Sequence, residues 1–197
     1  MVRLPPFGTV QKLAGRIWRR PGVGTACWTG ATFGTWRGLL DSYVPVALAL
    51  TTQSTSTIGI LISVANTAAL MGSGLAGWVR PAGVRTSLLI GIFATGLGTA
   101  ALGPLAGVVL ATGCTLVVSG LGAGLLQTLG PATATQAVVY QEQGDAIASV
   151  GLFRASALFG APLGMAAMVL VAPVGMAFNV VGLLVTLPVA VPTRARP

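Results

Sequence analysis

The sequence predicts an all-α membrane protein with a bundle of six transmembrane helices. Two properties of its composition support this fold class: only 7% of the 197 residues are charged and 54% are hydrophobic, and the mean hydropathy is +0.87. Soluble domains carry about 25% charged residues, so too few polar side chains are present to cover a water-exposed fold. A third observation is that apolar segments of about 20 residues, the length of a membrane span, follow one another along the chain.

Residues 1–21 come before these segments and hold five of the eleven basic residues. Val10, Leu13 and Ile17 fall near one face of a helix, whereas Lys12 and Arg16 fall largely on another. This pattern predicts a short amphipathic helix at the membrane surface, with its basic face toward anionic headgroups. The segment lacks a clean apolar core followed by a small-residue cleavage site, so it is not read as a signal peptide.

Six helices are predicted next, at residues 24–49, 57–78, 85–102, 105–129, 147–171 and 174–192. Short stretches of turn-forming residues separate several of them, at 51–57, 102–105 and 171–175. The third and fourth segments nearly touch, so five helices are an alternative to the predicted six. The chain is therefore divided into a basic surface segment (1–21), a six-helix transmembrane domain (22–193) and a tail (194–197).

The basic residues outside the spans support six helices and set an orientation. With six helices, both ends of the chain and the 2–3 and 4–5 connections lie on one side of the membrane. That side holds nine basic residues: Arg3, Lys12, Arg16, Arg19, Arg20, Arg80, Arg85, Arg194 and Arg196. The three opposite connections carry no charge. Because basic loops stay inside, both termini are expected in the cytoplasm, with the protein in the cell (plasma) membrane.

Several functional classes fit the sequence poorly. The net charge of +8 would suggest nucleic acid in a soluble protein, but the basic residues flank apolar segments and form no continuous basic face. The chain has no histidine and three acidic residues, and it lacks the usual hydrolase, zinc-protease and phosphate-loop motifs. We therefore expect no enzyme, no metal and no cofactor. The two cysteines lie in apolar segments and are expected to be buried.

Charged and large polar residues within the predicted spans are the candidate transport residues. Arg37 and Asp41 are one helical turn apart and can pair, either to keep the helix insertable or to serve a site where Arg37 attracts an anion and Asp41 carries a proton. Arg154 can extend to the interface, pair with Glu142 or Asp145, or point into the bundle. The remaining candidates can bind solute or hydrogen-bond neighbouring helices; they are Asn66, Gln127 and Asn179.

The stretch GLAGWVRPAGVRTSLL at 74–89 resembles the helix 2–3 loop of the major facilitator superfamily, whose pattern is Gly-x-Leu-Ala-Asp-Arg-x-Gly-Arg-Arg. Leu75 and Ala76 match this pattern, and Gly83 and Arg85 match it after a slightly longer turn, which contains Arg80. Gly77 stands where the family has an aspartate. The resemblance implies that this aspartate belongs to a charge network that gates the cytoplasmic side, and that network lacks its acidic member here.

A second stretch, residues 120–164, is similar to the helix 4–5 region of the same superfamily. It contains a glycine-rich helix, Pro131, a short charged connection, Arg154 within a helix, and the sequence GAPLG. The surface segment followed by the first helix resembles the entry into the second six-helix half of these twelve-helix transporters. The resemblance thus covers nearly all of the chain and implies one half of such a transporter, most like the second.

These observations predict secondary active transport of a small organic solute, of efflux type, with proton coupling through Asp41 as a further expectation. One half lacks the opposing wall of a transport path, so the expected partners are lipid, the solute, and either a second copy or another six-helix half. The alternative is a truncated membrane module that binds a partner chain without transporting.

Overall fold

The computed structural model describes residues 18, 20, 22–51, 53–79, 81 and 83–190. Within them the chain forms six α-helices: α2 (Val23–Leu50), α3 (Thr55–Val79), α4 (Val84–Leu105), α5 (Val109–Gln136), α6 (Gln143–Val169) and α7 (Val174–Ala190). A short 3-10 helix, η2 (Tyr140–Glu142), precedes α6. The all-α six-helix fold predicted from the sequence is confirmed. Most of the predicted surface segment, the tail at 194–197 and Arg80 lie outside the described residues.

Two boundaries differ from the expected ones because prolines lie inside helices. The expected break at 102–105 contains Pro104, which belongs to the last turn of α4, and the chain turns at 106–108 instead. The hydroxyl of Thr112 donates to the carbonyl of Leu105 at 2.8 Å and so satisfies an end group of this helix. Likewise α5 continues through Pro131 to Gln136, where Thr133 donates to the carbonyl of Leu129 at 2.7 Å.

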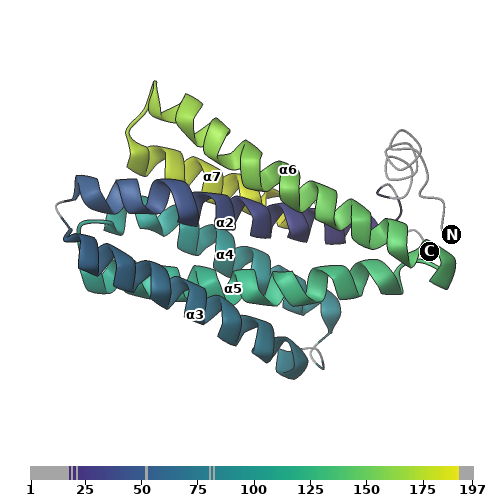
Figure 1. The fold of residues 1–197 in the computed structure, drawn as a ribbon. Coiled ribbons are helices and arrows are strands. Elements are labelled where there is room, and N and C mark those ends of the chain that lie inside the picture. Colours follow the sequence, from purple (N-terminus) through teal and green to yellow (C-terminus); the bar gives the residue numbers. More distant parts are fainter. Residues whose placement is uncertain are drawn as a thin grey trace, which may run out of the picture.

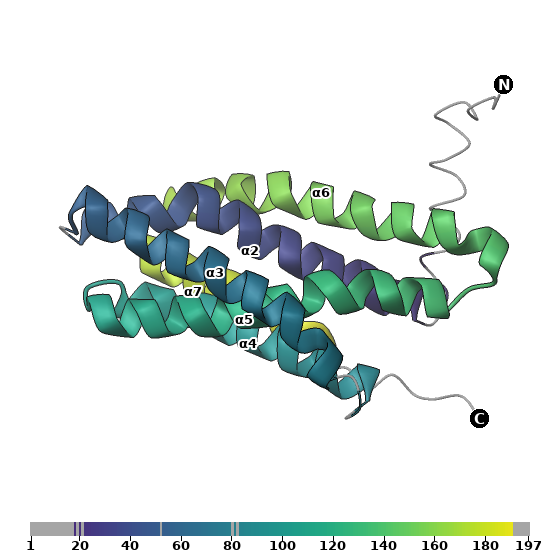
Figure 2. The same cartoon turned by 60° about the horizontal axis from the view of Figure 1, so that its bottom comes forward.

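The helices form two layers (Figures 1 and 2). In the view of Figure 1 a front layer contains α6, α2, α5 and α3, and α7 and α4 lie behind it. The contacting pairs fit this order: α2 packs on α6 and α5, α3 packs on α5, and α4 packs on both α5 and α7. Because α3 and α6 form the two edges of the front layer, the outer surfaces of α2 and α5 lie between them.

Successive helices alternate in direction, so α2 begins at the end of the bundle where α7 finishes. The indole N–H of Trp28, near the start of α2, donates to the carbonyl of Val185 in α7 at 3.1 Å. We call this end the Arg20 end, since Arg20 lies there and pairs with Glu142 at the α5–α6 connection. Of the described residues, Arg85 in the first turn of α4 and Asp145 in the first turn of α6 also lie at this end, and the opposite connections at 51–54, 106–108 and 170–173 are uncharged in sequence.

Small residues let the helices approach closely. A Cβ added at Gly38 of α2 would lie 2.5 Å from the carbonyl oxygen of Leu158 in α6. A Cβ at Gly120 of α5 would lie 2.6 Å from that of Ala65 in α3. Both contacts are too short for any residue with a side chain, so these glycines set the spacing between backbones, as is common where helices pack in lipid.

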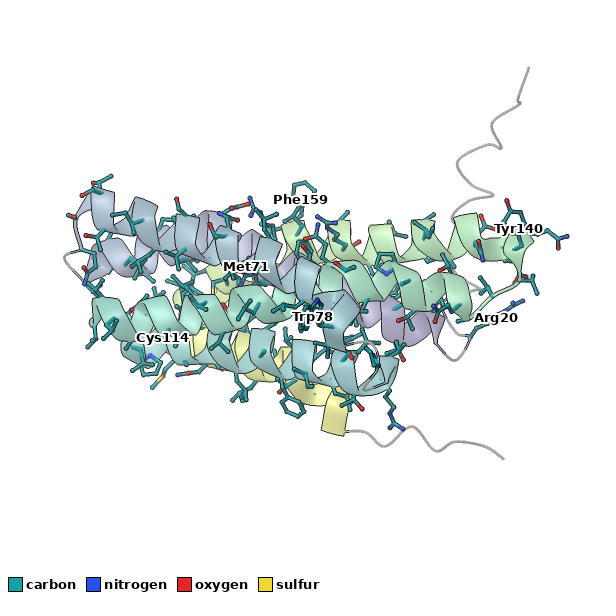
Figure 3. All side chains as sticks on the ribbon, turned by 90° about the horizontal axis from the view of Figure 1, so that it is seen from below. Arg20, Met71, Trp78, Cys114, Tyr140 and Phe159 are labelled. Atoms are coloured by element: carbon teal, nitrogen blue, oxygen red, sulfur yellow. The ribbon has the colours of Figure 1, made fainter. Side chains whose placement is uncertain are left out.

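The outer surface is apolar. Leu110 of α5 and Leu170 after α6 are 80% and 86% exposed, and Figure 3 shows side chains such as Phe159 projecting outward from the bundle. Four helices, α3 to α6, are long and apolar enough to cross a membrane; α7 is apolar but shorter, and α2 is long but carries Arg37 and Asp41. Cys27 is buried as expected, whereas Cys114 is exposed because it faces outward from α5.

Candidate solute-binding site

Arg37 and Asp41 form an ion pair near the middle of α2. The Nε of Arg37 lies 2.9 Å from Oδ2 of Asp41, and their side chains are 38% and 50% exposed. A second guanidinium nitrogen of Arg37 donates to Oδ1 of Asn66 on α3, and the amide nitrogen of Asn66 donates to its own helix at the carbonyl of Ile62, at 3.1 Å. The i,i+4 pairing expected from the sequence is therefore present, and Arg37 also links two helices.

The hydrogen bond from Arg37 to Asn66 places these two residues and Asp41 on the outer surface of the front layer, which we call the front face. α5 lies between α2 and α3 in the front layer, and α4 lies behind them. Because α4 occupies the back, Arg37 reaches Asn66 across the outer surface of α5. Charged groups thus lie on the outer surface of the bundle, about 21 Å along the axis from the first residue of α2, far from either end of the helix.

Arg154 approaches the same face from α6. Its guanidinium carbon lies 4.4 Å from the centre of the Phe33 ring on α2, a geometry in which the ring face attracts the cation. Phe33 precedes Arg37 by four residues, one turn of α2. The guanidinium of Arg154 therefore lies against the turn of α2 that precedes the turn holding Arg37.

The structure separates Arg154 from the acidic partners that the sequence offered. Glu142 binds Arg20 instead: the second nitrogen of Arg20 donates to Oε1 of Glu142 at 3.0 Å. Asp41 binds Arg37, and Asp145 lies in the first turn of α6. Among the described residues, which include all three acids of the chain, none lies within 4.0 Å of the Arg154 guanidinium.

Close packing of α2 on α6 positions Arg154. A Cβ at Gly34 would collide with the backbone carbonyl of Arg154, and Gly30 and Gly38 make similar approaches to Val150 and Leu158. The three glycines recur every four residues on α2, so one smooth strip of the helix receives α6. Neither Phe33 nor this strip was among the residues predicted to form the site, although the glycines of GATFGTWRG recur every four residues in the sequence.

The other two candidates lie in different places. Gln127 is exposed on α5, between the side that meets α3 through Gly120 and the side that meets α2 through Gly130. It therefore points toward the front face. Asn179 is half-buried on α7, near the side where Gly182 meets α4, and so it belongs to the back layer. The front cluster is defined here as Phe33, Arg37, Asp41, Asn66, Gln127 and Arg154.

The 2–3 connection lies at the Arg20 end. Gly83 adopts φ +102°, a left-handed backbone that favours glycine, and it places the start of α4 behind the end of α3. The hydroxyl of Ser87 donates to the carbonyl of Val79 at 3.0 Å and so ties the two helices together. Leu75 and Arg85 are exposed, and Ala76 is buried.

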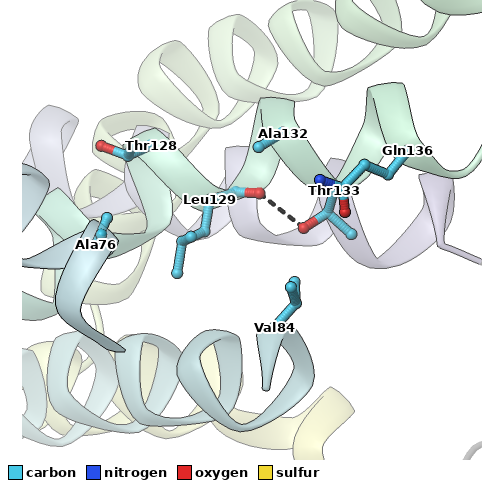
Figure 4. Close-up of a pocket in the computed structure, with 8 residues that line it drawn as sticks. Ala76, Val84, Thr128, Leu129, Ala132, Thr133 and Gln136 are labelled. Carbon is cyan, nitrogen blue, oxygen red and sulfur yellow. Dashed lines mark hydrogen bonds between the residues drawn. The ribbon is translucent and has the colours of Figure 1, made fainter. Parts of the chain in front are cut away.

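A cavity of about 160 Å³ lies beside this connection, between α3, α4 and α5 (Figure 4). Its walls include Ala76 and Gly77 of α3, Val84 of α4, and Leu129 and Thr133 of α5. A Cβ added at Gly77 would meet nothing within 4 Å. The cavity is lined mainly by apolar groups, and none of its lining residues is charged, so it has no charged group with which to bind a polar solute.

A second cavity, of about 440 Å³, opens at the opposite end of the bundle between α2, α4, α6 and α7. Its lining includes Leu50, Val169 and Phe178, and its polar side chain is Thr51. No group of three or more His, Cys, Asp or Glu side chains is placed to hold a metal among the described residues. The front cluster is therefore the place in the described structure where charged and hydrogen-bonding groups converge away from the ends.

Comparison with known proteins supports the fold. The structure is similar to the inward open conformation of the xylose transporter XylE from E. coli, with a TM-score of 0.66 and 20% sequence identity. The match covers 86% of this chain and 47% of that chain, so this chain spans about half the length of the transporter. No family model matches the sequence, and no curated protein matches it. The fold of this chain is thus similar to that of about half of the xylose transporter.

Proposed function

We propose that this chain is a six-helix half of a secondary transporter and that the front cluster contacts the transported solute. The observation that carries the proposal is the position of Arg37, Asp41 and Arg154 on an exposed surface midway along the bundle. An ionised side chain facing lipid costs about 2.5–3.5 kcal/mol on insertion scales. Charges exposed at this depth are therefore expected to face protein or water.

A second six-helix body would provide the opposing wall. Transporters of this architecture bind solute near the midplane, between two repeats that rock against each other. The match to about half of the xylose transporter supports the idea that the front face is one such wall. We assign the second wall to another copy of this chain, and a separate six-helix chain is the alternative.

The direction and coupling of transport belong to the same proposal. The basic connections at the Arg20 end favour a cytoplasmic location for that end and for both termini, in the plasma membrane. The transport is of efflux type, and Asp41 couples it to a proton, since it is a half-exposed carboxyl group beside a cation at the site. The solute is a small organic molecule.

A non-transporting module is the second candidate, and one observation favours it. Gly77 occupies the place of the family's acidic gating residue and leaves open space beside the cavity at the 2–3 connection. A chain without this charge has lost one contact that holds the cytoplasmic side closed. In this alternative the front face would bind a partner chain permanently.

Flux measurements in proteoliposomes distinguish the two candidates. The purified chain is reconstituted and tested with radiolabelled benzoate, glucose and tetraethylammonium, which carry negative, zero and positive charge. Transport predicts that at least one probe crosses faster than in protein-free liposomes and that Arg37→Gln abolishes the difference, whereas Asn179→Ala in the back layer preserves it. Flux equal to that of protein-free liposomes for all three probes, from a correctly folded dimer, contradicts transport and favours the module.

A further inference from the structure

The charges of the front cluster do not balance. Arg37 and Arg154 contribute two positive charges and Asp41 contributes one negative charge, so the cluster carries a net charge of +1. Asp41 is already engaged by the Nε of Arg37 at 2.9 Å. Arg154 rests on the ring of Phe33 at 4.4 Å, a contact that attracts the cation but leaves its formal charge uncompensated.

The sequence contains no further acid to remove this surplus. Its three acidic residues are Asp41, Glu142 and Asp145. Glu142 is bound to Arg20, and Asp145 lies nine positions before Arg154 along α6, about 13 Å along the helix axis. A second copy of the chain would bring another surplus positive charge and no additional acid, so a homodimer makes the imbalance larger.

We infer that the solute accepted by the front cluster is a small monocarboxylate, and that Arg154 is the residue that binds its carboxylate. This inference rests on the proposed function and specifies its substrate class. One bound monoanion per chain makes its cluster electrically neutral, so the proposed dimer, which has two such clusters, would bind two monoanions. Neutrality matters because an uncompensated charge in a low-dielectric environment is costly, so the two walls close over the loaded site more easily than over the empty one.

The geometry also explains why Arg154 rather than Arg37 receives the anion. Arg37 already donates to Asp41 and to Asn66, whereas the only contact the structure gives for the Arg154 guanidinium among the described residues is the Phe33 ring. A guanidinium has five N–H donors in a planar fork that matches a carboxylate. Arg154 is exposed, so a ligand at the front face can reach these N–H donors.

Binding measurements on the whole chain in lipid nanodiscs test the inference. The probe is benzoate, and its uncharged isostere benzamide is the matched ligand control. We expect benzoate to raise the thermal transition of the protein in a saturable manner, and benzamide to leave it unchanged. Arg154→Gln is expected to weaken benzoate binding by roughly tenfold or more, as for loss of a hydrogen bond to a charged group.

Two further variants keep the test decisive. Arg154→Lys retains the charge and should recover part of the affinity, and it serves if the glutamine variant does not fold. Arg85→Gln removes an exposed arginine in the first turn of α4 and should bind benzoate as the unmodified chain does. Equal shifts with benzoate and benzamide, or unchanged benzoate binding in a folded Arg154→Gln variant, overturn the inference.

Flux separates a failure of this inference from a failure of the proposed function. If tetraethylammonium or glucose is transported and benzoate does not bind, the chain is a transporter and the monocarboxylate assignment is wrong. If benzoate binds through Arg154 and no probe crosses the bilayer, the site assignment holds and the transport proposal fails.

Discussion

Arg37 and Asp41 pair at 2.9 Å on the half-exposed surface of α2, midway between the two ends of the bundle. A pair in this position is neutral as a unit but leaves a charge in the membrane when either partner is removed. Replacing Asp41→Asn should therefore lower the free energy of unfolding by about 1 kcal/mol, the upper range for an exposed pair. The double variant Arg37→Gln, Asp41→Asn should recover most of this loss.

Thermal unfolding in one detergent measures these changes. A double variant that loses the sum of the losses of Arg37→Gln and Asp41→Asn would show that the two side chains contribute independently and would contradict the pairing. In the transport assay, Asp41→Asn should also abolish the dependence of flux on an imposed pH gradient. Unchanged pH dependence in that variant would remove Asp41 from the coupling mechanism.

The close approach of α2 to α6 gives a second prediction. Gly38→Ala places a Cβ 2.5 Å from the carbonyl oxygen of Leu158, so the helices must separate, and overpacking of this kind costs about 1–3 kcal/mol. Gly160→Ala on α6 is the matched control because a Cβ there meets nothing within 4 Å. It should be neutral or stabilising, since alanine favours helix over glycine. A comparable loss of thermal stability in both variants would argue against the α2–α6 packing described above.

The ion pair between Arg20 and Glu142 gives a third prediction, at the Arg20 end. Its side chains are 48% and 29% exposed, so the coupling should be small, about 0.2–1 kcal/mol. A double-mutant cycle with Arg20→Gln and Glu142→Gln measures it. The coupling should fall as salt is raised, because salt screens exposed charges. A coupling of zero at low salt would mean that the segment before α2 is not held by this pair.

These contacts show which parts of the fold the sequence predicts. Hydropathy places the six helices because each apolar segment must match the thickness of a bilayer, and the spacing of Arg37 and Asp41 alone implies that they pair. The extension of α5 beyond Pro131 was not predicted, because a proline was expected to end the helix, whereas α5 continues through it to Gln136. A proline in the sequence does not by itself show whether a helix ends there or continues through it.

Contacts between helices were the least predictable part of the site. Arg37 binds Asn66, and Arg154 packs on Phe33, whereas Asn179 lies in the back layer. These outcomes depend on how each helix is rotated about its axis, and that rotation is fixed by tertiary packing on glycines such as Gly34. A single sequence gives the polar residues of the spans but not which of them face one another.

The orientation of the bundle gives a fourth prediction. In a background without Cys27 and Cys114, single cysteines at Tyr140, which is 87% exposed, and at Val171, which is 88% exposed, lie at opposite ends of α6. An impermeant thiol reagent added to intact cells should label Val171→Cys and leave Tyr140→Cys unlabelled until the cells are opened. The reverse pattern would place the Arg20 end outside and contradict the cytoplasmic assignment of the basic connections.

The account depends most on what covers the front face. The mass of the purified protein in lipid nanodiscs or mild detergent, measured by native mass spectrometry, tests this directly. The account predicts a stable dimer, twice the 19.7 kDa of one chain, in which the charged groups of α2 are no longer exposed. A monomer that persists at high protein concentration in lipid would contradict pairing with a second copy, and this chain alone would then lack the opposing wall of a transport path.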